Sequence, residues 1–168
     1  MAHEPDPTDE REILTWSQFG DASRDLAEAV VASGFRPDLV LSIARGGLTV
    51  GGALAYALGI KNCFTINVEY YTGIDQRMDL PVVLPPVPDP VAMQDLNVLV
   101  ADDVADTGHT LAMVHRFCEG HVREVRAAVL YQKSHSVIAP EYVWRRTDRW
   151  IAFPWSADGP VAGAEPTD

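Results

Sequence analysis

Three carboxylates and a run of small and hydroxyl residues lie close together in the middle of the chain. Asp102 and Asp103 come directly after an apolar run, Asp106 follows them, and residues 107–110 read Thr-Gly-His-Thr. Carboxylates accept hydrogen bonds from sugar hydroxyls and bind hard cations, whereas hydroxyls and backbone N–H groups donate to phosphate. This combination predicts a ligand that carries hydroxyls and a phosphate, with a metal ion as a further partner.

The elements around these residues favour the same kind of ligand. Residues 98–101 are apolar and predict a buried strand, and apolar residues spaced as in a helix predict one near 108–118. The acids therefore lie where a strand leads into a helix. Unpaired N–H groups and the positive end of the helix dipole attract anions at such a turn, and Gly108 lets the backbone come close to them.

Length and charge exclude several classes of protein. With 168 residues, the chain is predicted to form one domain over 13–156, with flexible tails at 1–12 and 157–168. The formal charge of −11 argues against binding to nucleic acid or to an anionic membrane surface. We expect a cytoplasmic protein, because there is no leader pattern and no apolar run long enough to cross a membrane. The two cysteines are expected to be buried free thiols.

Strand and helix patterns alternate along the chain. A helix capped by Ser17 is predicted to end at Gly34, and a second is predicted over 48–58; residues 69–96 show no sustained period and predict a long functional loop. Strands are predicted at 39–43, 63–68, 98–101, 125–131 and 142–144. This alternation predicts an α/β fold with a mostly parallel sheet, and ligands of such folds bind at the carboxyl ends of the strands. The glycine turn at 44–47 and the acidic turn both fall there.

Other known motifs with similar letters do not fit this context. Asp102-Asp-Val-Ala-Asp106 matches the DDxxD pattern of prenyl synthases, but that pattern belongs to a helix of an all-α protein. Asp106-Thr-Gly108 matches the aspartic-protease triplet, which needs an all-β fold and a second copy. The spacing of a phosphorylated-aspartate loop fails, and no Walker A sequence occurs.

The unbroken run over 98–111 resembles the binding motif for 5-phosphoribosyl-1-pyrophosphate (PRPP) in the type I phosphoribosyltransferases. The resemblance implies that Asp102 and Asp103 face the ribose hydroxyls, with Asp103 near Mg²⁺. It also implies that the rest of the motif holds the 5-phosphate; these residues are Val104, Ala105, Asp106, Thr107, Gly108, His109 and Thr110.

A second loop of that family is similar to Ala44-Arg45-Gly46-Gly47 in this chain. The resemblance implies that Arg45, Gly46 and the loop amides contact the pyrophosphate, and that the Ala44–Arg45 peptide bond is cis. It further implies a small hood beside the sheet and a mobile loop that carries Arg77 toward the pyrophosphate as it closes.

Most of the chain is similar to bacterial xanthine-guanine and related 6-oxopurine phosphoribosyltransferases. In those enzymes the residue that matches Lys133 contacts the purine 6-oxo group, the residue that matches Trp150 stacks on the ring, and backbone near Ile151 reads the other edge. Ser134 departs from the proline that is expected after this lysine. His135 and three other histidines form no metal spacing and are interpreted as surface or loop residues.

The resemblance implies a Mg²⁺-dependent transfer of the 5-phosphoribosyl group from PRPP to hypoxanthine, guanine or xanthine in purine salvage. Asp106 is the candidate general base. Two alternatives stay open, a phosphoribosyltransferase for another base and a PRPP-sensing regulator with little catalysis. The family also implies a homodimer or homotetramer.

Overall fold

The computed structural model describes residues 11–71 and 80–162, with the side chains of 70, 71, 80 and 81 left out. In chain order the elements are β1 (Glu12–Ile13), α1 (Trp16–Ala32), β2 (Leu39–Ala44), α2 (Gly46–Leu58), β3 (Cys63–Tyr71), β4 (Leu80–Leu84), α3 (Pro90–Met93), β5 (Asn97–Ala105), α4 (His109–Glu119), β6 (Glu124–Gln132), β7 (Tyr142–Arg146) and β8 (Ile151–Ala152).

The main sheet has six strands in the order β4-β3-β2-β5-β6-β7. Every pair in it is parallel except β3 with β4, which is antiparallel. β2 and β5 form its centre, and the apolar runs that predicted them are buried along nearly their whole length. The predicted α/β fold with a mostly parallel sheet is confirmed.

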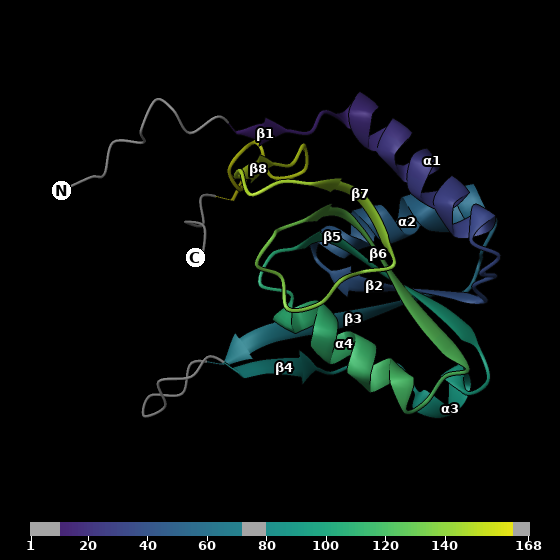
Figure 1. The fold of residues 1–168 in the computed structure, drawn as a ribbon. Helices are drawn as coiled ribbons and strands as arrows, with labels where there is room; N and C mark the ends of the chain where they lie inside the picture. Colours follow the sequence, from purple (N-terminus) through teal and green to yellow (C-terminus); the bar gives the residue numbers. More distant parts are fainter. Residues whose placement is uncertain (1–10, 72–79, 163–168) are drawn as a thin grey trace.

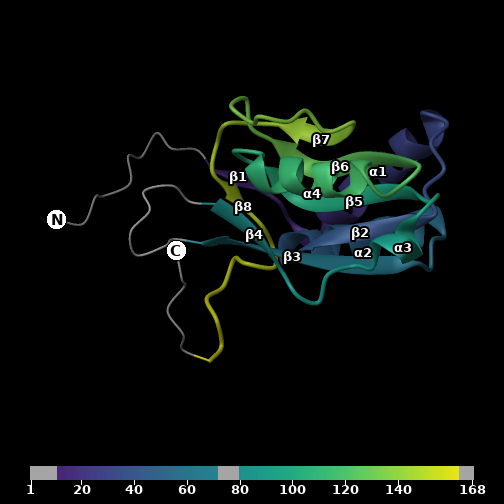
Figure 2. The same ribbon diagram turned by 90° about the horizontal axis from the view of Figure 1, so that it is seen from below.

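Helices cover both faces of this sheet. Figure 1 shows α1 and α2 on the upper side and α4 on the lower side, and Figure 2 shows α4 lying across β5 and β6. One buried cluster joins α1 and α2 to the sheet, and a second joins α4 to the opposite face. Burial of two separate apolar layers holds the carboxyl ends of the central strands in fixed positions.

A small unit of two strands lies beyond the carboxyl ends of the main sheet. β1 pairs in parallel with β8, and Leu14 N–H extends the contact with a 3.0 Å bond to the Ala152 carbonyl. In Figure 1 this pair is separate from the six-stranded sheet and close to β7. Glu12 thus belongs to a strand, although the sequence placed it in a flexible tail; residues 1–10 lie outside the described part.

Three other sequence-based expectations differ from the structure. The N-cap of α1 is Thr15 and not Ser17, because Thr15 and Gln18 form a reciprocal capping box. The stretch 69–96 is more regular than expected, since its described residues include β4 and α3. Cys118 is buried as predicted, and burial raises the pKa of its thiol to about 12, but Cys63 is exposed.

None of the helices in the described residues is long and apolar enough to span a membrane.

Candidate active site

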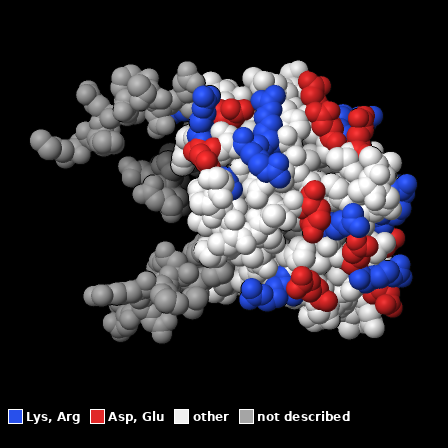
Figure 3. All heavy atoms as spheres, in the orientation of Figure 1, with Lys and Arg blue, Asp and Glu red and all other residues white. Residues whose placement is uncertain are grey.

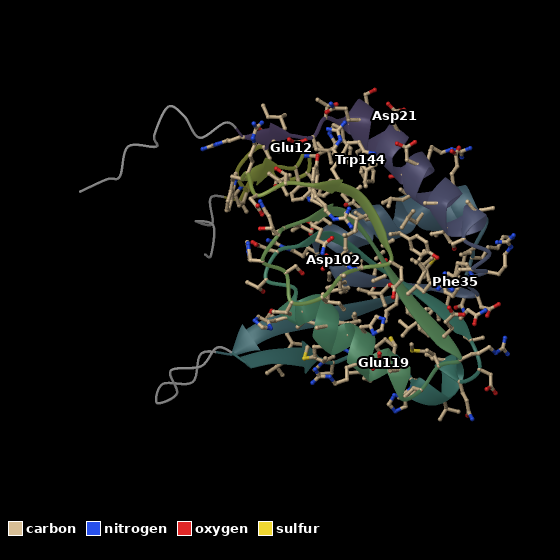
Figure 4. The ribbon with its side chains drawn as sticks, viewed as in Figure 1. Glu12, Asp21, Phe35, Asp102, Glu119 and Trp144 are labelled. Atoms are coloured by element: carbon tan, nitrogen blue, oxygen red, sulfur yellow. The ribbon has the colours of Figure 1, made fainter. Side chains whose placement is uncertain are left out.

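The acidic stretch lies at the carboxyl end of β5, in the middle of the molecule. Asp102 is 8% exposed, Asp103 is half-buried, and Asp106 is exposed beyond the end of the strand. Figure 4 labels Asp102 between the upper helices and α4, where the strand leaves the core. The three carboxylates therefore occupy different environments and are suited to different tasks.

Backbone amides hold the two buried carboxylates in place. Asp102 Oδ1 accepts a 2.9 Å hydrogen bond from Asp103 N, and Asp103 Oδ1 accepts a 2.8 Å bond from Val104 N. Burial raises the pKa of Asp102 well above its ordinary value, and the neighbouring charge of Asp103 raises it further. Burial also raises the pKa of Asp103. Neither carboxylate forms an ion pair within the described residues. The two side chains together therefore offer several hydrogen-bond acceptors that no cationic side chain neutralises.

The glycine turn after β2 packs directly against these acids. A Cβ atom at Gly46 would overlap the carboxylate of Asp103, and one at Gly47 would overlap the backbone carbonyl of Ala101. Only glycine allows α2 to begin so close to the end of β5. The predicted cis peptide between Ala44 and Arg45 is present, and this confirms that expectation.

Arg45 precedes α2 as its N-cap residue and is exposed. It makes no ion pair in the part of the chain that the structure describes. A guanidinium beside the start of a helix provides donors for an anion such as a diphosphate. Arg77, the other predicted pyrophosphate ligand, lies outside the described residues.

The turn between β5 and α4 has the geometry that an anion site requires. Gly108 has φ = +81°, a left-handed conformation that favours glycine, and α4 begins at the next residue. Thr107 Oγ1 accepts a 3.4 Å bond from His109 N. The N-terminal amides of α4 are thereby gathered beside hydroxyl groups, and this arrangement suits a phosphate.

Both turns open into one cavity of ≈ 620 Å³. Its lining comes from the end of β2, the start of α2, one residue of β3, and the turn into α4. These residues are 43–46, Val68, 102–104 and 106–111. The structure therefore brings together every described residue predicted to bind PRPP, although Ala105 is itself buried outside the lining. Val68, from β3, was not predicted.

The predicted base-binding residues lie on the neighbouring strand and beyond it. Lys133 follows β6, is 8% exposed, and donates from Nζ to the carbonyl oxygen of Arg149. Trp150 is 69% exposed, and Ile151 is buried at the start of β8. The three residues lie close together, but none of them lines the cavity. Their purine-binding roles remain predictions.

The segment 134–138, which follows the predicted Lys133, is a part of the site that the sequence did not predict. Lys133 N donates to the carbonyl of Ala105 at 3.0 Å, and Val137 N donates to that of Thr107 at 2.8 Å. Between them, His135 Nε2 lies 2.8 Å from Asp106 Oδ1. His135 was interpreted as a loop residue without a role. Its place just after the strand beside β5 was the signal that could have indicated this contact.

Charge near the site is distributed unevenly. The chain as a whole is acidic, but on the face in Figure 3 Lys and Arg side chains gather over β7 and β8. β7 carries Arg145 and Arg146; Arg145 pairs with Glu12 at 3.1 Å and Arg146 donates to Gln132. Because these cations have partners, an anionic ligand in the cavity would depend on the two turns themselves.

These observations define a class of protein: an α/β fold in which two turns at the carboxyl ends of central parallel strands form a site for a phosphorylated sugar. Comparison with known families gives the same answer. Residues 9–159 match the family described as phosphoribosyl transferase domain. The chain therefore belongs to the phosphoribosyltransferase family, and its resemblance to the bacterial xanthine-guanine enzymes is confirmed.

Individual relatives are similar over nearly the whole chain. A xanthine-guanine phosphoribosyltransferase from Idiomarina loihiensis is 28% identical over 161 residues, 91% of this chain and 94% of its own. One from Roseobacter denitrificans is 31% identical, covering 84% and 83%. The crystal structure of a purine phosphoribosyltransferase from Pyrococcus horikoshii has a TM-score of 0.80 and 36% identity, covering 90% of this chain and 97% of that one. The chain is thus a pentosyltransferase, and these relatives support PRPP-dependent salvage of purine bases.

Proposed function

We propose that the protein transfers the 5-phosphoribosyl group of PRPP to a 6-oxopurine base, giving a nucleoside 5′-monophosphate and pyrophosphate. The observation that carries this proposal is the meeting of the two turns around one cavity, with Lys133 one strand away. Carboxylates on one side suit the ribose hydroxyls, and helix-start amides on the other suit phosphate. PRPP needs both in one place.

The donor would lie across the ends of β2 and β5. Asp102 and Asp103 would accept from the ribose hydroxyls, residues 104–110 would hold the 5-phosphate, and Arg45 with Gly46 would face the diphosphate. The cavity volume of ≈ 620 Å³ falls within the range of small-molecule sites. Acceptors at Asp102 and Asp103, donors at the start of α4 and the guanidinium of Arg45 support this placement.

A Mg²⁺ ion fits the chemistry of this site. Two carboxylates lie side by side without an ion pair in the described part of the chain, and burial raises the pKa of both. The described residues contain no group of three or more His, Cys, Asp or Glu side chains able to hold a metal alone. Magnesium typically binds one or two carboxylates together with substrate phosphates, and Asp103 is the proposed ligand. When bound, the ion neutralises charge on the departing diphosphate.

The preference for a 6-oxopurine rests on Lys133. An ammonium group only donates hydrogen bonds, so it favours the 6-oxo oxygen and disfavours the 6-amino group of adenine. Lys133 is buried and already donates to the carbonyl of Arg149, next to the exposed ring of Trp150. That indole would cover one face of the purine, and Ile151 would supply backbone contacts.

The proposed reaction forms a bond between purine N9 and C1 of the ribosyl group. The bond between C1 and the diphosphate oxygen breaks, and its electron pair leaves with pyrophosphate. The proton of the attacking purine passes to the carboxylate of Asp106, which acts as general base. The exposed position of Asp106 beside the cavity makes it accessible to a base. Arg45 and the amides of the α2 turn would stabilise the charge on the leaving group.

A panel of bases tests this function directly. Protein, Mg²⁺ and PRPP are mixed with hypoxanthine, guanine, xanthine, adenine or uracil, and pyrophosphate release is measured. Release with the 6-oxopurines alone is the expected result. Release only with adenine or uracil would show a transferase for another base. PRPP binding without release would favour a sensor. A cytoplasmic location and assembly as a homodimer or homotetramer are further proposals that rest on the family.

A further inference from the structure

The imidazole of His135 contacts the carboxylate that the proposed reaction uses as its base. His135 Nε2 and Asp106 Oδ1 are 2.8 Å apart, and the two side chains are 58% and 60% exposed. The residues are 29 positions apart in the sequence. The contact therefore depends on how two neighbouring strands end, not on local sequence.

Backbone pairing fixes the two residues opposite each other. The hydrogen bonds from Lys133 N to Ala105 O and from Val137 N to Thr107 O continue the contact between β6 and β5 beyond the ends of both strands. On the same segment, Ser136 packs so closely on Gly108 that a Cβ there would overlap its hydroxyl. His135 lies between these contacts and is held against Asp106 rather than placed there by a flexible loop.

We infer that His135 is a positioning residue for Asp106: its hydrogen bond occupies Oδ1 and leaves Oδ2 as the oxygen that takes the proton from the purine. This inference rests on the proposed function. A free carboxylate can rotate and offer either oxygen to solvent, whereas one that is held at Oδ1 presents Oδ2 in a constant direction. Correct orientation of a catalytic group contributes substantially to rate.

Other charged groups also face the imidazole. Asp106 comes from the turn after β5, Asp148 comes from the connection between β7 and β8, and Lys133 precedes His135 on its own segment. The pKa of Asp148 is lowered chiefly by hydrogen bonds from Ser134, and the charges of His135 and Lys133 lower it further. His135 therefore lies between two carboxylates, and its hydrogen bond goes to Asp106, the proposed base.

Two substitutions test the hydrogen bond to Asp106. In His135→Gln the amide nitrogen takes the place of Nε2, so the hydrogen bond persists. In His135→Ala the hydrogen bond is lost. At about pH 8 we expect His135→Ala to lower kcat about tenfold, a fraction of what a general base contributes, with the KM for PRPP unchanged. His135→Gln should recover most of this loss, because its amide can still donate to Asp106. His121→Ala is the matched control, because His121 is exposed just beyond the far end of α4 and bonds to the Phe117 carbonyl.

A double-mutant cycle then shows whether His135 acts through Asp106. In an Asp106→Asn background, His135→Ala should have no further effect on kcat, because the group it positions is already lost. Additive losses would overturn the inference, and so would a His135→Ala variant with the kcat of the wild type. If the Ala variant does not fold, the Gln variant decides alone: a kcat about tenfold or more below that of the wild type, although its amide can bond to Asp106, overturns the inference. A wild-type protein that releases no pyrophosphate with any base would instead contradict the proposed function.

Discussion

The two halves of the proposed site are built from different kinds of structure. The donor half, residues 44–47 and 102–110, lies at the ends of two central strands and at the starts of two long helices. The base half, residues 133–138 and 148–151, consists of connecting segments and the short strand β8. In the donor half, backbone amides at two helix starts and side chains from the strand ends form the site together. In the base half, single side chains span the gaps between segments.

This difference has a physical consequence for specificity. Close packing, such as that of Gly46 against the Asp103 carboxylate, leaves the donor half little freedom to adapt. The base half depends on contacts such as those from Lys133 to Arg149 and from Ser134 to the Asp148 carboxylate. Side-chain contacts change with single substitutions, whereas packed strand ends do not. The donor should therefore be fixed and the base adjustable.

The largest expected effect comes from Asp106, where the two halves meet. Asp106→Asn keeps the size of the side chain and an oxygen that can accept from His135, but removes the basicity. We expect kcat to fall roughly 10²- to 10⁴-fold while the Kd for PRPP stays nearly unchanged. Pyrophosphate release and equilibrium binding of PRPP measure the two quantities separately. Unchanged turnover would remove Asp106 from the mechanism.

A second test targets the close packing of the donor half. In Gly46→Ala the new methyl group would overlap the Asp103 carboxylate and separate the two turns. A misplacement of about 1 Å can cost roughly 10²-fold, and we expect a loss of that size in kcat/KM for PRPP. Gly52→Ala, also on α2, is the matched control, since nothing lies within 4 Å of its added Cβ. That control should gain roughly 0.5–1 kcal/mol in the free energy of unfolding, as helix propensity predicts. Equal activity of the two variants would contradict the packing argument.

The fold class could be predicted from the alternation of strands and helices, and the position of the donor half could be predicted because residues 98–111 form one continuous run at the end of a strand. The roles of its single residues come from the resemblance to the family and stay predictions. The proximity of Gly46 and Asp103 can also be predicted from the sequence, because both turns are expected at the carboxyl ends of parallel strands. The close packing of these two residues cannot be predicted, since it depends on how α2 and β5 fit together.

The base half could not be predicted to the same depth. The contact of His135 with Asp106 depends on backbone pairing beyond the strand ends, which no periodic pattern reports. The strand β4 was missed for a similar reason. Its prolines suggest a loop, but Pro81 is in an edge strand, where a missing N–H is tolerated. At the start of α1, two hydroxyl residues compete as caps, and Gln18 decides in favour of Thr15 because it completes the capping box.

A third prediction concerns the base half alone. Lys133→Met keeps the apolar stem and removes the charged donor. A hydrogen bond to a charged group contributes about 1.5–3 kcal/mol, so we expect kcat/KM for 6-oxopurines to fall roughly 10- to 100-fold. The Kd for PRPP should not change, because Lys133 does not line the donor cavity. Equal losses for a 6-oxopurine and for adenine would show that Lys133 does not read the 6-oxo group.

The smallest expected effect is on stability, and it has opposite signs in the two halves. Asp102 is a buried acid of the donor half whose pKa is raised by burial, and Asp148 is an exposed acid of the base half whose pKa is lowered by hydrogen bonds from Ser134. A raised pKa means that the folded state retains a proton that the unfolded state has lost, so the charge of Asp102 reduces stability as pH rises above 3.8. A lowered pKa means the reverse, so the charge of Asp148 adds stability that is lost as pH falls through its folded pKa.

Thermal unfolding of Asp102→Asn and Asp148→Asn without ligand, from about pH 5 to about pH 8, measures this contrast. The Asp102 variant should gain in Tm relative to the wild type as pH rises, because asparagine keeps an acceptor for Asp103 N without a buried charge. The Asp148 variant should have a lower Tm than the wild type by a constant amount over this range, because the whole range lies above the ordinary pKa of 3.8 and a neutral amide accepts less strongly from Ser134 N. A Tm difference for the Asp102 variant that is independent of pH would show that its buried charge has no net cost. If both effects are found, the donor half holds a charge that is unfavourable until a ligand and its cation arrive, while the base half uses its charge to hold the segment that carries His135.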